Sequence, residues 1–219
     1  MKLNVSKGNM YKFITHTGNV IKGKCSDHDC SYCYMKKWGN LNPVRFDEKE
    51  LKIGMGSDKF IFVGSSCDMF ARNIPVEWIY KTLDHCKEFD NKYFFQTKNP
   101  LSLLSLCSHL PENSVVCTTI ETNRKYIEMG NAPDTYNRAV CFSKIPLEKY
   151  VTIEPILDFD LNELVELIKL CRPMQVNIGA DTGGHKMPEP GKEKIFELIT
   201  ELEKFTKVEL KKNLNRLMR

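Results

Sequence analysis

The chain has 219 residues, of which 42% are hydrophobic and 27% charged, a composition typical of a soluble globular domain with a full hydrophobic core. Its 32 basic and 28 acidic side chains leave a net charge of +4, too mild to indicate a nucleic-acid partner by itself. No apolar run reaches the roughly 18 residues of a membrane-spanning helix, and the first residues lack the apolar stretch of a secretory signal. We therefore expect a cytoplasmic protein with no membrane partner.

Short apolar runs rich in β-branched and aromatic residues alternate with helical patterns. The expected strands are Asn19–Lys22, Lys59–Val63, Tyr93–Thr97, Ser114–Ile120, Tyr150–Ile153, Gln175–Ile178 and Lys207–Leu210. Apolar residues at helical spacing predict helices around 76–83, 161–168 and 195–202. This alternation predicts an α/β fold with parallel strands and right-handed crossovers, in a sheet that is either open and doubly wound or closed into a full or partial barrel.

Two positions in the sequence carry helix-start signals. Asp160 precedes Leu161 and is followed by Glu163, which is the pattern of a capping box. Asn99 precedes Pro100, which places a capping residue before a proline in the first helical position. No internal repeat or flexible linker divides the sequence, so we expect one domain over residues 1–219.

Small or polar residues follow most of the expected strands. They are Gly64–Asp68, Gln96–Lys98, Glu121–Asn123, Glu154–Pro155, Gly179–Asp181 and Lys211–Asn213. In either parallel architecture the carboxyl ends of the strands share one face, where binding sites are built. The sequence therefore predicts a site at this face.

The nine cysteines are unevenly distributed. Six are scattered singly and are most simply buried apolar side chains in a reducing compartment. These six are Cys67, Cys86, Cys107, Cys117, Cys141 and Cys171. The other three, Cys25, Cys30 and Cys33, stand at C-x4-C-x2-C spacing directly after the first expected strand. The residues between them are too polar for a core, so we interpret the three thiolates as ligands of one metal centre.

Soft thiolate ligands favour either an iron–sulfur cluster or zinc. Structural zinc takes four protein ligands, and His28 inside the loop is available as the fourth. Three cysteines alone instead suit a [4Fe–4S] cluster with one iron left open. No second ligand pair follows at zinc-finger spacing, which favours the cluster, and zinc remains the alternative.

This loop resembles that of the radical S-adenosylmethionine (SAM) superfamily, where three cysteines follow the first strand and an aromatic residue, here Tyr32, precedes the third. The usual spacing is C-x3-C-x-aromatic-C, and this chain has one extra residue in the first gap. Four further stretches are similar to spore photoproduct lyase: Tyr32–Tyr34, Ser65–Asp68, Phe95–Lys98 and Thr119–Glu121. Together with Thr152–Pro155 and Ile178–Asp181 they are more similar still, over nearly the whole chain, to a phage- and prophage-associated radical-SAM-like family of unknown activity. The resemblance implies a partial (β/α)6 TIM-like barrel, a [4Fe–4S] cluster and SAM.

The resemblance also implies roles for single residues. In the superfamily the open iron chelates SAM, and one electron cleaves SAM to methionine and a 5′-deoxyadenosyl radical that abstracts hydrogen from substrate. Carried over, Lys98 pairs with the SAM carboxylate, and Ser65 and Asp68 line the site near the SAM amine. Thr119 and Glu121 bind the methionine or ribose portion. The remaining cofactor-binding residues that it implies are Tyr32, Tyr34, Glu154 and Asp181.

Photoproduct lyase uses a cysteine after its second strand to return hydrogen to a substrate radical. Ser65 occupies the ungapped position in this chain, and Cys67 follows two residues later, on the same face of an extended strand. Serine cannot replace a thiol as hydrogen donor because its O–H bond is much stronger. The shift weighs against photoproduct repair, and Cys67 is the hypothesised catalytic donor.

The substrate is indicated only by association. Basic residues near the carboxyl terminus and the resemblance favour a nucleic acid or nucleotide, with a flavodoxin- or ferredoxin-like electron donor as a further partner. Two alternatives stay open: a radical SAM enzyme that modifies a peptide, and a non-enzymatic zinc or iron–sulfur module that binds nucleic acid.

Overall fold

The computed structural model describes residues 1–25, 27–39 and 42–219, and its main feature is an eight-stranded sheet. The strands are β1 (Leu3–Val5), β2 (His16–Gly18), β5 (Phe60–Val63), β6 (Lys92–Thr97), β7 (Ser114–Thr119), β8 (Glu148–Ile153), β9 (Gln175–Ile178) and β10 (Lys207–Leu210). They lie in chain order, parallel from β2 to β10, with β1 antiparallel at one edge. In a doubly wound sheet the order would reverse at a switch point. The predicted partial TIM-like barrel is confirmed.

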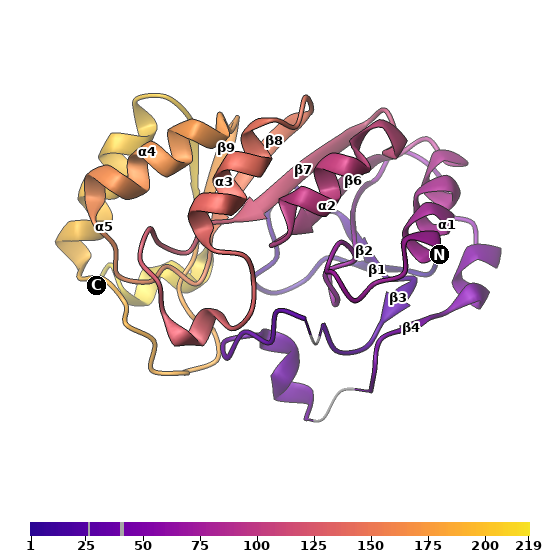
Figure 1. Cartoon of the computed structure of the whole chain (residues 1–219), viewed down its shortest axis with the longest axis horizontal. Coiled ribbons are helices and arrows are strands. Elements are labelled where there is room, and N and C mark those ends of the chain that lie inside the picture. Colours follow the sequence, from indigo (N-terminus) through magenta and orange to yellow (C-terminus); the bar gives the residue numbers. More distant parts are fainter. Residues whose placement is uncertain (26, 40–41) are drawn as a thin grey trace.

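Helices cover one face of this sheet and follow one another in an arc (Figure 1). They are α1 (Val76–Lys87), α2 (Pro100–Ser105), α3 (Thr135–Ser143), α4 (Leu161–Cys171) and α5 (Lys192–Glu203). Each connects two consecutive strands from β5 to β10, and α2, α3, α4 and α5 pack each on the next. The helices expected around 76–83, 161–168 and 195–202 are confirmed. None of the helices in the described part of the chain is long and apolar enough to cross a membrane.

The first crossover, from β2 to β5, carries no α-helix among its described residues. It contains a small antiparallel pair, β3 (Ile21–Lys22) with β4 (Arg45–Phe46), and two short 3-10 helices. The strand expected at Asn19–Lys22 is therefore misplaced, because the main-sheet strand is β2. That strand has the polar sequence His16-Thr17-Gly18, so a search for apolar runs does not detect it. Gly18 is needed there because a Cβ would lie 2.7 Å from Met1 Cε.

The expected capping box at α4 is wrong, although the helix begins at Leu161 as predicted. Asp160 makes no side-chain cap hydrogen bond. Its carboxylate instead accepts hydrogen bonds from Arg124 Nε at 2.9 Å and Asn123 Nδ2 at 3.1 Å. A charged guanidinium donates a stronger hydrogen bond to a carboxylate than a backbone amide does, so the ion pair with Arg124 forms in place of the helix cap. Asn99 also caps nothing: its Nδ2 donates to Phe70 O and Ser102 Oγ.

The inner face of the barrel is filled only along the first half of the strands. Phe62, Phe94 and Val115 point inward there and pack against Tyr11 and Ile14 of the amino-terminal segment. These buried aromatic and aliphatic side chains close that end of the barrel, in the way that side-chain layers fill larger barrels. The second half of the strands, where the polar residues lie, is left open for a cavity.

Candidate functional site

A cavity of about 980 Å³ opens at the carboxyl ends of the strands. Its wall is built from the amino-terminal segment, the cysteine loop and residues at the carboxyl ends of the strands from β5 to β10. Twelve of the thirteen residues predicted for the site line it: Cys25, Cys30, Tyr32, Cys33, Tyr34, Ser65, Cys67, Asp68, Lys98, Thr119, Glu154 and Asp181. Glu121 does not line the cavity, because its carboxylate lies fully buried behind the wall.

The cysteine loop is held in place by the segment that follows β7. Ser31 N donates to Glu128 O at 2.9 Å, and Asn131 N donates to His28 O at 2.7 Å. Between them Gly130 has φ +66°, and a Cβ there would lie 2.1 Å from His28 O. Only glycine fits so close an approach at this backbone angle. Sequence reasoning missed Gly130, since nothing in the local pattern marks its contact with the loop.

The three loop cysteines are the residues that could hold an iron–sulfur cluster. All three are free of disulfides. Cys30 Sγ accepts a hydrogen bond from Lys98 Nζ at 3.3 Å, the kind of contact that tunes cluster thiolates. No group of three or more His, Cys, Asp or Glu side chains among the described residues gathers tightly enough for a single metal ion. A cluster binds each thiolate on a separate iron, so its ligands stand farther apart.

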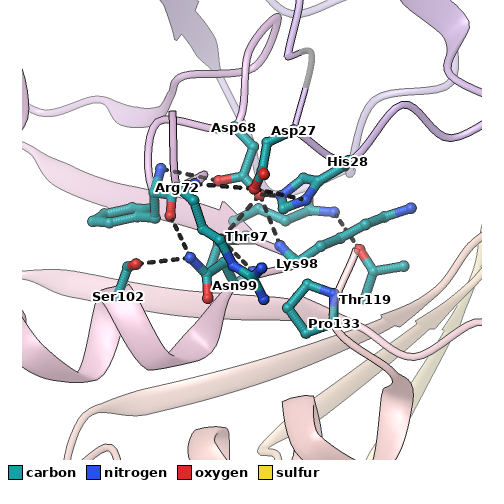
Figure 2. A network of polar contacts seen from close by, with 12 residues as sticks. Asp27, His28, Asp68, Arg72, Thr97, Lys98, Asn99, Ser102, Thr119 and Pro133 are labelled. Carbon is teal, nitrogen blue, oxygen red and sulfur yellow. Dashed lines mark hydrogen bonds and ion pairs between the residues drawn. The ribbon is translucent and has the colours of Figure 1, made fainter. Parts of the chain in front are cut away.

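His28 lies between two carboxylates, as Figure 2 shows. Its Nε2 is 2.9 Å from Asp68 Oδ2, and its Nδ1 is 3.7 Å from Asp27 Oδ2. The Asp68 carboxylate also accepts from Thr97 Oγ1 and from the backbone N of Lys98, at 3.0 and 2.8 Å. Burial alone would raise the pKa of Asp68, but the His28 hydrogen bond and the backbone donors outweigh it and lower this pKa. Asp68 therefore ties the cysteine loop to the end of β6.

Lys98 belongs to a buried polar group that we call the Glu121 network: Lys98, Tyr32, Glu121 and Arg138. Lys98 Nζ lies 2.7 Å from Glu121 Oε1 and 2.8 Å from the Tyr32 hydroxyl, which itself donates to Glu121 Oε1 at 2.5 Å. The other oxygen, Glu121 Oε2, accepts from Arg138 Nη1 at 2.7 Å. Glu121 and Arg138 are completely buried. Sequence reasoning missed Arg138, which lies on the unpredicted helix α3.

The charges of this network hold one another ionised. Burial alone would raise the pKa of Glu121, but Arg138 and then Lys98 outweigh it and bring the pKa down to about 2. Burial alone would lower the pKa of Lys98, but the Glu121 carboxylate outweighs it and raises this pKa. Burial raises the pKa of Tyr32, so its phenol is neutral. The network thus presents a fixed ammonium to the cavity.

This coupling predicts a pH-dependent stability. The folded pKa of Glu121 lies below its ordinary value of 4.5, so its ionised form contributes stability that is fully present above about pH 4.5 and is lost as the pH falls through about 2. At one pKa unit per roughly 1.4 kcal/mol, the contribution is on the order of 3 kcal/mol. Glu121→Gln should therefore lower the free energy of unfolding by about this amount near neutral pH, and by less near pH 3.

Urea denaturation of wild type and variant at several pH values measures the difference. The exposed Glu112→Gln is the matched control and should change nothing. A wild-type advantage over Glu121→Gln that stays constant down to about pH 2 would contradict the assigned pKa shift.

The opposite wall of the cavity is centred on Glu154. Its Oε1 accepts from Asn9 Nδ2 at 2.9 Å and Asn213 Nδ2 at 2.8 Å, and its Oε2 lies 2.5 Å from Lys211 Nζ. The Lys211 ammonium also lies 4.2 Å from the centre of the Tyr11 ring. Residues near both ends of the chain therefore surround Glu154, and the predicted strand-end residues did not include Asn9 or Tyr11.

The other predicted residues are held by local contacts. Tyr34 OH donates to Ser65 O at 2.6 Å, which joins the cysteine loop to the end of β5. The Asp181 carboxylate contacts His185 in the same loop. It accepts a hydrogen bond from the backbone N of His185 and lies 2.8 Å from His185 Nδ1. Thr119 Oγ1 accepts from Gln96 Nε2 at 3.2 Å. All of these side chains keep a surface on the cavity.

The fold is that of a known enzyme. No protein-family model matches the chain, and no curated protein matches it. Among solved structures, a spore photoproduct lyase mutant with bound AdoMet and dinucleoside spore photoproduct superposes with a TM-score of 0.66 at 11% identity, over 93% of this chain and 78% of that one. A second mutant gives 0.66 at 13%, over 96% and 78%, and the lyase complexed with the dinucleoside gives 0.62 at 12%, over 94% and 78%. At such low identity the likeness establishes the shared fold.

Proposed function

We propose that this chain is a radical SAM enzyme whose Cys25, Cys30 and Cys33 hold a [4Fe–4S] cluster and whose barrel cavity binds SAM. The proposal is carried by one observation: three free cysteines and the Lys98 ammonium meet in one cavity, on a fold shared with an enzyme solved with AdoMet. When bound, the cluster supplies the electron that cleaves SAM to methionine and a 5′-deoxyadenosyl radical.

The chain's own residues bind and orient SAM in this proposal. Lys98 pairs with the SAM carboxylate, because its ammonium is held rigidly over the Tyr32 ring, 4.4 Å from the ring centre, and keeps 16% of its side-chain surface exposed. Asp68 keeps the cysteine loop in place and presents its carboxylate to the SAM amine, with Ser65 beside it. Glu121 acts from behind the wall, by fixing Lys98.

The farther wall suits the adenosine portion and the substrate. Thr119, Glu154 and Asp181 present hydroxyl and carboxylate oxygens to the cavity, and such groups accept hydrogen bonds from ribose hydroxyls. The buried apolar cluster around Tyr11 and Ile14 of the amino-terminal segment fills the other end of the barrel and excludes water there. A radical that abstracts hydrogen needs such a dry, enclosed space, because closure prevents side reactions.

Cys67 is proposed as the hydrogen donor to the substrate radical. It lines the cavity and is 3% exposed, and burial together with Asp68 raises its pKa to about 12, so the S–H proton is retained at neutral pH. In D2O, we expect wild-type product to carry deuterium from this exchangeable thiol and Cys67→Ala product to carry several-fold less. Mass spectrometry of the product measures this, with Cys141→Ala as control; unchanged turnover and labelling in Cys67→Ala would remove the role.

The proposed substrate is a nucleic acid or nucleotide. Lys7, Lys24, Lys36 and Lys37 line the cavity, and Lys37 Nζ lies 5.2 Å from the centre of the exposed Trp38 ring. Lysines that contact phosphates beside an exposed aromatic ring that stacks on bases are typical of sites for single-stranded nucleic acid. The structural neighbour's dinucleoside ligand supports the same class.

Product analysis tests the function and its rivals. Anaerobically reconstituted protein, with SAM and a reductant standing in for a flavodoxin- or ferredoxin-like donor, should release 5′-deoxyadenosine, and a DNA or RNA oligonucleotide should be modified. Modification of a peptide library instead would favour the peptide-modifying enzyme. Colourless protein with one zinc per chain would favour the non-enzymatic module, in which His28 is the fourth ligand.

A further inference from the structure

Arg138 is a completely buried cation that no part of the proposed SAM chemistry uses directly. It lies on α3, and its Nη1 donates to Thr119 O at 2.8 Å and to Glu121 Oε2 at 2.7 Å, while its Nε donates to Pro133 O. Burying a guanidinium is costly unless a carboxylate and further acceptors compensate. Arg138 has both through its Nη1 and Nε, while its buried Nη2 has no hydrogen-bond partner in the described part of the chain, and the guanidinium forms a fixed charge inside the protein.

The Glu121 network connects this charge to the cysteine loop. Glu121 bridges Arg138 to Lys98, and Lys98 Nζ lies 3.3 Å from Cys30 Sγ. The two cations Lys98 and Arg138 and the one anion Glu121 leave the network with one net positive charge. Because its members are largely or fully enclosed, solvent screens that charge weakly.

We propose that Arg138 is a positioning residue that sets the charge facing the cluster: through Glu121 it fixes Lys98 against Cys30 and keeps the network at one net positive charge, which raises the cluster's reduction potential. Reduction adds a negative charge to a cluster, so a nearby cation and a hydrogen bond to a ligand sulfur both favour the reduced form. This inference rests on the proposed function, since it requires that the loop hold a cluster.

The net charge of the network predicts the order of the cluster reduction potentials among variants of the reconstituted protein. Arg138→Met removes one positive charge and should lower the ratio of reduced to oxidised cluster about tenfold at a fixed poise, or about 59 mV for one electron. Arg138→Lys keeps the charge and should return the potential towards wild type. The double variant Arg138→Met with Glu121→Gln restores the net charge and should also return it. Glu121→Gln alone should shift the potential upward.

Reductive titration without SAM, followed by electron paramagnetic resonance, measures these potentials. Arg124→Met is the matched control, because Arg124 pairs with Asp158 and Asp160 outside the network, and its potential should equal wild type. If Arg138→Met fails to fold, the upward shift in Glu121→Gln is the deciding result.

Three results would overturn the inference. One is a potential that does not follow the net charge, such as an unshifted Arg138→Met. Another is a double variant that stays as low as Arg138→Met, which would indicate a packing role alone. The third is the absence of a cluster in wild type, which would overturn the proposed function as well, whereas the first two would leave it standing.

Discussion

Replacing any one of Cys25, Cys30 and Cys33 with alanine is expected to abolish the iron-based visible absorbance of anaerobically reconstituted protein. In the proposed cluster each thiolate would bind a separate iron, so losing one would leave two ligands, too few to hold it. The three cysteines line one cavity, and Cys30 is 6% exposed. The measurement is the visible spectrum together with iron and sulfide content per chain.

Matched variants show whether the loss is specific. Cys107→Ala and Cys141→Ala remove half-buried thiols that do not line the cavity, and both should keep the absorbance. Cys67→Ala should also keep it, since Cys67 is proposed as hydrogen donor and not as ligand. Full absorbance in any of the three loop variants would contradict the ligand assignment.

Lys98→Ala is expected to keep the cluster and to weaken SAM binding by at least about thirtyfold, because removing one partner of a largely desolvated charge pair typically costs 2–5 kcal/mol. Lys98 is the cation that the Glu121 network holds in the cavity wall beside Cys30. The loss should appear in the dissociation constant of SAM, measured by equilibrium dialysis on the reconstituted protein.

Lys92→Ala is the control on the same strand. Lys92 lies at the opposite end of β6, where it pairs with Glu148 at 3.0 Å, 42% exposed, and SAM affinity should be unchanged. If Lys98→Ala loses the cluster, or binds SAM as wild type does, the role assigned to Lys98 is wrong.

The sequence predicted the frame of the barrel well because buried parallel strands carry continuous apolar runs. Strands β5 to β9 contain such buried runs, and helices α1, α4 and α5 follow from apolar residues at helical spacing. The site face was predictable for a related reason: strands in one direction bring their ends to one edge, so residues far apart in sequence, such as Cys30 and Lys98, meet there.

What the sequence did not predict depends on contacts across the fold. β2 is a short polar strand stabilised by its neighbours, and α3 is a nine-residue helix with a weak apolar stripe whose signal, the capping Asp134, is a single residue. From the sequence alone Arg138 would be taken for a surface arginine, whereas the packing of α3 buries it completely. Gly130 and Tyr11 likewise make contacts that shape the site with partners more than fifty residues away, His28 and Gln96.

The electron paramagnetic resonance spectrum of the reduced, reconstituted protein, recorded with and without SAM, tests the central claim most directly. A cluster held by Cys25, Cys30 and Cys33 alone has one iron free to bind SAM, so the signal of the reduced cluster should change when SAM is added. A cluster signal that SAM leaves unchanged, or protein that binds zinc and gives no signal, would contradict the account.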